Sequence, residues 1–156
     1  MGLREDLQSH TVNELILRPY APVRSGATVS DAVTAMKAAG IGAAMILDES
    51  CKPIGMFNEK ILIRLLANNP DALSEPVEQH MTRHVVCVRR DQPIATLISV
   101  MQENTLRWVC VTDEQGRAEF LTGLRGVLEY VTDYFPREVK VQPDESRLAM
   151  DQREGA

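Results

Sequence analysis

The fold is decided by residues 29–49, VSDAVTAMKAAGIGAAMILDE, because the same pattern returns 65 residues later in residues 94–114, IATLISVMQENTLRWVCVTDE. The two stretches align without a gap, and the pair Asp48-Glu49 recurs as Asp113-Glu114. Few positions are identical, but the apolar positions coincide along the whole register. An internal repeat of this kind indicates one structural unit that is used twice.

Each copy predicts an amphipathic helix followed by a buried strand. The apolar residues with helical spacing are Val29, Ala32, Val33 and Met36 in the first copy and Ile94, Leu97, Ile98 and Met101 in the second. Short apolar runs follow at Ala43–Leu47 and Trp108–Thr112. Both runs end at Asp-Glu, which is typical of a strand that leads into a turn.

The remaining elements complete each unit in the order strand, helix, strand, strand, helix. A short strand follows each turn as the second arm of a hairpin, and a final helix closes the unit. A further strand precedes each first helix, and Pro22 restricts the first of these to a sheet edge. The predicted ranges are 20–23, 54–57 and 59–67 in the first copy and 85–88, 119–122 and 124–134 in the second.

These elements predict a mixed α/β fold (α+β in stricter usage) built from two tandem β-α-β-β-α repeats. Each unit is too small to bury a full core alone, so the two are expected to pack face to face. The predicted organisation is an N-terminal extension (1–11), a first repeat (12–70), a second repeat (76–135) and a flexible, charged C-terminal tail (136–156).

The composition excludes several classes of function. The 17 cationic residues are scattered among 22 acidic ones, and the net charge of −5 argues against a nucleic-acid-binding surface. No apolar run is long enough to insert into a membrane, and no signal peptide is expected at the charged N-terminus. Three isolated cysteines indicate reduced thiols in a cytoplasmic protein.

Motifs for catalysis and metal binding are also missing from the sequence. His80 and His84 have the spacing of two ligands on one helix face, but Met81-Thr82 separates them and no third ligand is near. We therefore expect no metal site. A phosphate-binding glycine loop, a nucleophile elbow and a dinucleotide fingerprint are absent, so an enzyme is not expected.

The segment Pro76–Thr82, followed by Val85–Val88, resembles the opening of a cystathionine-β-synthase (CBS) domain. Gly55-Met56-Phe57 resembles the glycine and two apolar residues that enter the last helix of that family. The resemblance implies a tandem pair with pseudo-twofold symmetry whose clefts bind adenosine-containing ligands such as AMP, ADP, ATP or S-adenosylmethionine. It also implies a homodimer that regulates an enzyme or transporter, without catalysis.

The resemblance carries candidate ligand contacts onto this chain: Gly55, Asn58, Lys60, Thr82, Val86, Cys87, Trp108, Val109, Thr122, Gly123 and Arg125. The chain departs from the family at the hydroxyl and carboxylate that hold the ribose. Those two positions are Asn58 and Ile61 in the first copy and Gly123 and Gly126 in the second. A one-residue slip would bring Thr122 to the hydroxyl position. In either register the acidic ribose contact is missing.

Two functional hypotheses follow. The first is a ligand-sensing pair with no required cofactor and a possible bound adenine nucleotide. The second is a ligand-free module for dimerisation or protein docking, which the missing carboxylate favours. The apolar pairs Leu62/Leu66 and Val127/Val131 on the last helices also motivate the homodimer.

Overall fold

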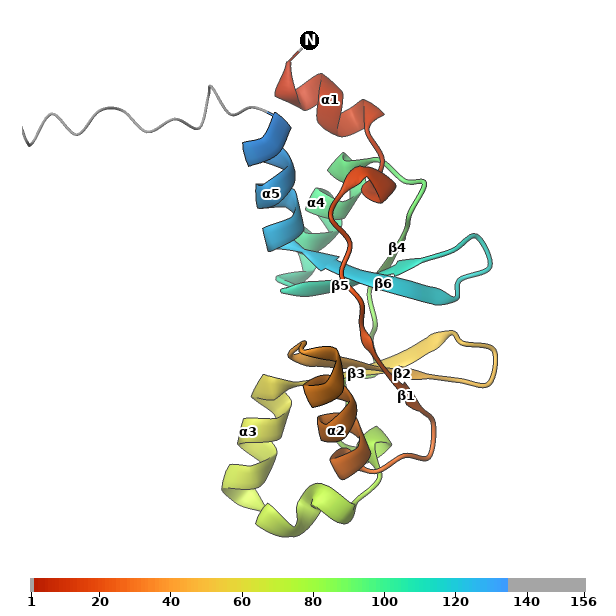
Figure 1. Cartoon of the computed structure of the whole chain (residues 1–156), viewed down its shortest axis with the longest axis vertical. Coiled ribbons are helices and arrows are strands. Elements are labelled where there is room, and N and C mark those ends of the chain that lie inside the picture. Colours follow the sequence, from red (N-terminus) through yellow and green to blue (C-terminus); the bar gives the residue numbers. More distant parts are fainter. Residues whose placement is uncertain (1, 135–156) are drawn as a thin grey trace, which may run out of the picture.

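The computed structural model describes residues 2–134, which form two three-stranded sheets, each accompanied by two helices (Figure 1). Unit 1 contains strands β1 (Ala21–Arg24), β2 (Ala43–Leu47) and β3 (Pro53–Asn58) with helices α2 (Val29–Ala39) and α3 (Glu59–Asn68). Unit 2 contains strands β4 (Cys87–Arg89), β5 (Trp108–Thr112) and β6 (Ala118–Gly123) with helices α4 (Ile94–Asn104) and α5 (Leu124–Tyr134). In both sheets the first strand pairs parallel to the second, and the second pairs antiparallel to the third.

The predicted order of elements and the mixed α/β class are confirmed. Strands β2 and β5 and helix α5 have their predicted bounds, and β1 lies at a sheet edge, as Pro22 requires. Among the predicted strands the largest difference is β4, which begins at Cys87 instead of Val85. Val85 and Val86 precede this strand, and Val85 packs against the apolar cluster between the two sheets.

The Asp-Glu turns explain why acidic residues recur at the same place in both copies. Asp48 Oδ1 accepts hydrogen bonds from the backbone N–H groups of residues 50 and 52 at 2.8 and 2.9 Å. Asp113 Oδ1 accepts them from the N–H groups of residues 115 and 117, both at 2.9 Å. Each aspartate therefore holds a hairpin turn, which is a conformational role.

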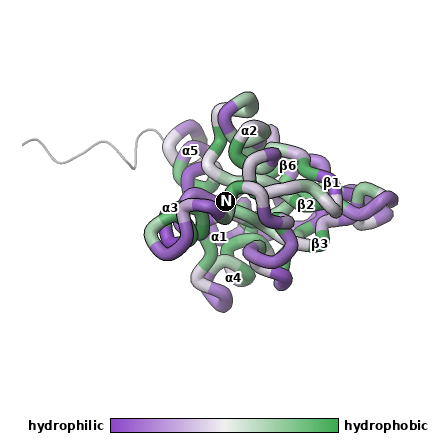
Figure 2. Tube along the Cα trace, turned by 90° about the horizontal axis from the view of Figure 1, so that it is seen from below, coloured by the Kyte–Doolittle hydropathy of each residue, from purple (hydrophilic) through white to green (hydrophobic). Residues whose placement is uncertain are grey.

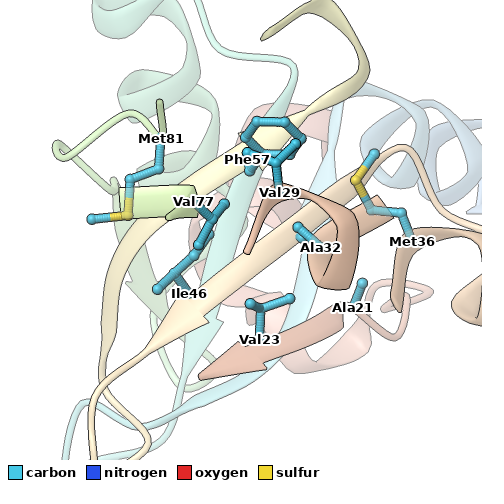
Figure 3. Packing of buried hydrophobic residues seen from close by; sticks show 10 residues of the cluster. Ala21, Val23, Val29, Ala32, Met36, Ile46, Phe57, Val77 and Met81 are labelled. Atoms are coloured by element: carbon cyan, nitrogen blue, oxygen red, sulfur yellow. The ribbon is translucent and has the colours of Figure 1, made fainter. Parts of the chain in front are cut away.

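Each unit receives core residues from the segment that leads into the other unit. Val12 and Leu15 precede β1 in the chain but belong to the core of unit 2. Val77 and Met81 precede β4 but belong to the core of unit 1, as Figure 3 shows. We call residues 11–20 and 76–86 the crossing segments. The predicted boundaries at 12 and 76 therefore begin sequence repeats but not spatial units.

The two crossing segments bind through equivalent backbone hydrogen bonds. The N–H of Val12 donates to the carbonyl of Gln92 at 2.9 Å, and the N–H of Val77 donates to that of Ala27 at 2.9 Å. The shift of 65 residues carries Val12 to Val77 and Ala27 to Gln92. A second pair of bonds, from residue 94 to residue 10 and from residue 29 to residue 75, is related in the same way. This reciprocity is the pseudo-twofold relation of the two units.

A third apolar cluster fills the space between the two sheets. It takes Ala43, Met45 and Leu47 from β2 and Cys110, Ala118 and Leu121 from β5 and β6. Figure 2 shows hydrophobic and hydrophilic stretches alternating along the helices, as expected when each helix turns one face to a core. The two units therefore pack face to face, as the shortage of core predicted.

The N-terminal extension contains helix α1 (Leu3–Ser9), which the sequence reading did not predict. This helix is too short for its apolar residues to show a helical period. Leu7 packs it against the core of unit 2. The predicted flexible tail, 136–156, lies outside the described residues. No helix between residues 2 and 134 is both long and apolar enough to cross a membrane.

Candidate functional site

A cavity of about 750 Å³ opens beside unit 2, where the first crossing segment meets β5, β6 and α5. Three parts of the chain that are distant in sequence form its wall. These are the crossing segment with Ile16, Arg18 and Pro19, the turn after α2 with residues 39–42, and the unit 2 residues Arg107, Trp108, Thr122, Gly123, Leu124, Arg125, Gly126 and Leu128. The cavity therefore exists only when both units are assembled.

Two glycines shape this wall because side chains would not fit there. A Cβ atom on Gly123 would lie 2.2 Å from the backbone carbonyl oxygen of Arg107. A Cβ atom on Gly126 would lie 2.8 Å from Oγ1 of Thr122. Gly123 therefore permits the strands β5 and β6 to approach at the mouth of the cavity, and Gly126 leaves room for the threonine hydroxyl.

Thr122 supplies a buried polar atom without a partner. The residue is only 1% exposed, and its Oγ1 makes no hydrogen bond within the described part of the chain. A buried hydroxyl that lacks a partner costs about 1–3 kcal/mol. Thr122 also lines the cavity, but this oxygen is closed off from solvent, so a ligand atom would reach it only after a shift of the wall.

Arginines dominate the charge of the cavity wall. Arg18 Nη2 lies 2.8 Å from Glu129 Oε1, and Arg125 Nε lies 3.2 Å from the same oxygen. The guanidinium of Arg107 lies over the Trp108 ring, 5.8 Å from its centroid. Glu129 pairs with two of these three cations, and the carboxylate of Glu59 lies against the wall residue Gly42. Positive charge therefore exceeds negative charge at the site by one. An anion is the complementary ligand.

The pseudo-equivalent positions in unit 1 carry larger side chains, among them Asn58 for Gly123 and Ile61 for Gly126. A Cβ atom on Gly55 would lie 2.1 Å from the Met81 sulfur, so Met81 packs directly on this glycine. The shift of 65 residues carries Met81 to Ile16, which is 54% exposed at the cavity. It also carries Thr122 to Phe57, which is fully buried in the core of unit 1. The two copies therefore have different uses for equivalent positions.

The structure brings four of the eleven predicted contact residues to the cavity: Trp108, Thr122, Gly123 and Arg125. The β3 and β6 pairings place Asn58 opposite Ala43 and Gly123 opposite Trp108, so the ungapped register holds and Thr122 reaches the cavity without a slip. Arg125 begins α5 as predicted, and its side chain is well exposed.

The other seven predicted residues lie away from this cavity and have structural contacts. Asn58 caps α3 by accepting a hydrogen bond from the N–H of Ile61 at 3.0 Å. The Thr82 hydroxyl donates to the carbonyl of Met56 at 3.0 Å. The remaining five are buried, paired or exposed elsewhere. Gly55 lies against Met81, Lys60 is exposed at the start of α3, the Val86 carbonyl accepts from the N–H of Cys110, Cys87 is exposed on β4, and Val109 is in the core of unit 2.

Sequence reasoning missed the wall residues that come from unit 1 and from the first crossing segment, above all Arg18. The residues before β4 were chosen as contacts because they carry the family motif. The segment that reaches this cavity is the one before β1, and no motif marks it. One signal in the sequence could have pointed to Arg18. The repeat register aligns it with Arg83, so both copies carry an arginine at this position.

His80, which the sequence offered as one of two possible metal ligands, is paired with a neighbouring carboxylate. His80 Nε2 lies 2.6 Å from Glu75 Oε2, which pairs this histidine with a carboxylate just before its crossing segment. Across residues 2–134, no three His, Cys, Asp or Glu residues are grouped in a way that would hold a metal ion.

Comparison with known proteins gives the following matches. The family model described as CBS domain matches the chain twice, over residues 12–68 and 77–128. An uncharacterised 17.7 kDa protein of Acidianus ambivalens is 22% identical over 122 residues, which are 78% of this chain and 73% of that protein. The chain spans between 28% and 73% of the lengths of the curated relatives that it matches.

Two solved structures share the arrangement of the two units. A CBS-domain protein from Pyrobaculum aerophilum, complexed with AMP, is 20% identical with a TM-score of 0.68 over 79% of this chain and 99% of that one. The CBS-domain pair of protein MJ0100, in complex with 5′-methylthioadenosine and S-adenosyl-L-methionine, is 20% identical with a TM-score of 0.69 over 80% and 98% of the two chains. At these identities the likeness concerns the fold.

Proposed function

Because the chain belongs to the CBS-domain family, we propose that it is a non-catalytic regulatory module that senses an adenosine-containing ligand in the cavity beside unit 2. The observation that carries this proposal is the unpartnered hydroxyl of Thr122 in a wall that also holds three arginines. Under this proposal the module acts in the cytoplasm on an enzyme or transporter. The AMP and S-adenosylmethionine complexes of similar folds support the ligand class.

The charge of the wall favours a phosphorylated adenosine over S-adenosylmethionine. Arg18, Arg107 and Arg125 suit phosphate oxygens, and Trp108 offers a ring on which a base can stack. S-adenosylmethionine carries a sulfonium cation, which these arginines repel. We therefore expect AMP, ADP or ATP to bind more tightly than S-adenosylmethionine or adenosine.

One ligand per chain is the expected stoichiometry. Unit 1 has Phe57, Asn58 and Ile61 where the cavity wall of unit 2 has Thr122, Gly123 and Gly126, and Phe57 is fully buried. A ligand there would have to displace side chains from a packed core, which costs several kcal/mol.

Arg125→Ala is expected to weaken nucleotide binding by about tenfold or more, because a hydrogen bond to a charged group is worth roughly 1.5–3 kcal/mol. Titration calorimetry of the full chain with AMP, ADP, ATP, S-adenosylmethionine and adenosine measures affinity and stoichiometry together. Lys60→Ala is the matched control, since Lys60 is the residue equivalent to Arg125 and lies outside the cavity wall. Equal losses in both variants, or no binding of any compound to the unmodified chain, would contradict the proposal.

Thr122→Val is expected to act in opposite directions on stability and binding. Without ligand, the change removes a buried hydroxyl that has no partner, so the free energy of unfolding stays equal or rises by about 1 kcal/mol. With ligand, the hydrogen bond to Oγ1 is lost and affinity falls by about threefold to tenfold. Chemical denaturation and calorimetry on one preparation measure both. Full affinity in this variant would show that the Thr122 hydroxyl does not contact the ligand.

A second candidate function, self-assembly into a homodimer, is favoured by two equivalent exposed residues. Ile63 on α3 is 70% exposed and Leu128 on α5 is 55% exposed, and the repeat register relates them. The pairs first chosen for this role behave differently, because Leu62, Val127 and Val131 pack partly against their own cores. Related patches on both units suit a two-fold interface.

The double variant Ile63→Glu/Leu128→Glu is expected to shift the particle from a dimer to the 17.4 kDa monomer, since each change would bury a charge at the interface. Light scattering at micromolar concentration reads the mass. Leu73→Glu is the control, because Leu73 is an exposed apolar residue outside α3 and α5. An unmodified chain that is already monomeric would count against self-assembly.

A further inference from the structure

Two of the three cysteines face each other across neighbouring strands. In the parallel pair β4–β5, Cys87 is the register partner of Cys110. Register partners project from the same face of a sheet. For this pair it is the face toward unit 1, where Cys110 belongs to the cluster between the sheets. The pairing of the two strands therefore places the two thiols next to each other on this face.

The spacing of the two backbones suits a disulfide. Neighbouring strands lie about 4.7–4.9 Å apart. Cα atoms joined by a disulfide are usually about 4.4–6.8 Å apart. The pairing of β4 with β5 therefore brings the two Cα atoms into the range of a disulfide, and a small approach of the short strand β4 would close the bond.

The two thiols differ in access and acidity, as a reactive and a resolving cysteine do. Cys87 is exposed, whereas Cys110 is fully buried. The hydrogen bond from the Cys110 thiol lowers the pKa of Cys87, and the same bond together with burial raises the pKa of Cys110. Cys87 is thus the thiolate that solvent reaches first, and Cys110 keeps its proton.

We propose that Cys87 and Cys110 are a redox-active pair, in which a hydroperoxide oxidises Cys87 and Cys110 then closes a disulfide between β4 and β5. In the first step the Cys87 thiolate attacks the terminal oxygen of the hydroperoxide and the O–O bond breaks. An alkoxide leaves (hydroxide in the case of hydrogen peroxide), and Cys87 becomes a sulfenic acid. In the second step the Cys110 sulfur attacks the Cys87 sulfur, the S–O bond breaks, and the Cys110 proton leaves with the oxygen as water. The cysteines lose two electrons, which the peroxide gains.

The pair is independent of the proposed ligand site, but it lies on the same strand. Cys110 is two residues beyond Trp108, which lines the cavity. The short strand β4 would be fixed to β5 by a covalent bond in the oxidised protein. Oxidation therefore stiffens the sheet next to the cavity wall.

The sequence allows a direct test, because trypsin leaves each cysteine in a different peptide. Cys87 falls in residues 84–89, Cys110 in 108–117 and Cys51 in 38–60, since the Lys52–Pro53 bond resists cleavage. The full chain is treated with hydrogen peroxide, alkylated, digested and mapped by mass spectrometry, with and without a reductant. We expect a reducible link between the first two peptides, a mass loss of two hydrogens, and an alkylated Cys51.

Two exposed-site variants give the matched controls. Cys51→Ser is expected to form the link as the unmodified chain does, and Cys87→Ser is expected to lose it. Neither residue belongs to an apolar core, so both variants should fold. The proposal is overturned if Cys87 is found over-oxidised but unlinked, if Cys51 takes part in the link, if Cys87→Ser shows the same mass loss, or if peroxide leaves all three thiols free.

Discussion

Leu15→Ala is expected to lower the free energy of unfolding of the whole chain by about 3 kcal/mol, although Leu15 precedes every strand of the fold. The side chain is only 5% exposed and belongs to the core of unit 2. Its loss leaves a cavity among residues of the second repeat, which lies more than 70 positions further along the chain. A substitution in the first sequence repeat is therefore expected to destabilise unit 2.

The neighbouring residue supplies the control. Ile16→Ala removes a side chain of similar size that is 54% exposed, so its cost should stay below about 1 kcal/mol. Urea denaturation followed by circular dichroism and by the fluorescence of Trp108, the only tryptophan, compares both units in one experiment. We expect one coincident transition for each variant. Separate transitions, with only unit 1 affected, would show that the crossing segment does not complete unit 2.

Gly123→Ala is expected to destabilise the chain by about 3 kcal/mol, because the added Cβ atom would lie 2.2 Å from the carbonyl oxygen of Arg107. Gly123 pairs with Trp108 at the end of the hairpin, so neither backbone can retreat without breaking the β5–β6 register. The same distortion should deform the cavity wall that both residues form. Thermal and urea denaturation measure the loss.

Gly42→Ala is the matched control for this change. Its Cβ atom would also meet neighbours at 2.8 Å, but these belong to the carboxylate end of the Glu59 side chain, which can rotate away. The cost should therefore stay within about 1 kcal/mol. If both variants lost similar amounts of unfolding free energy, the contact with the Arg107 backbone would not explain why position 123 requires glycine.

The sequence predicted the fold well where one residue pattern determines one local structure. The apolar runs at Ala43–Leu47 and Trp108–Thr112 became β2 and β5 with their predicted bounds, because nearly every side chain there is buried. Helix α1 was missed, since seven residues with one partly buried apolar residue packed on a core hardly differ from a loop in pattern. The exchange of core residues was missed for another reason. Periodicity shows that Leu15 is apolar but not which unit it packs against.

The candidate site could be predicted only in part for the same reason. Trp108, Thr122, Gly123 and Arg125 lie next to each other along β5, β6 and α5, and local motifs located them. Arg18 reaches the wall through tertiary structure, which no motif encodes. The difference between the two copies depends on single side chains such as Phe57 in place of Thr122. Analogy treats the two copies alike, so it could not distinguish them.

The first crossing segment also sets the path by which events in the cavity reach the rest of the molecule. Arg18 exchanges two backbone hydrogen bonds with Leu121, at 2.8 and 2.9 Å, and three residues later Ala21 begins β1 opposite Ala44. Three residues span about 10 Å at most. A displacement of Arg18 therefore travels to the sheet of unit 1 through covalent bonds, without a relay of side chains. The quantity that such a displacement would change is the orientation of one sheet relative to the other.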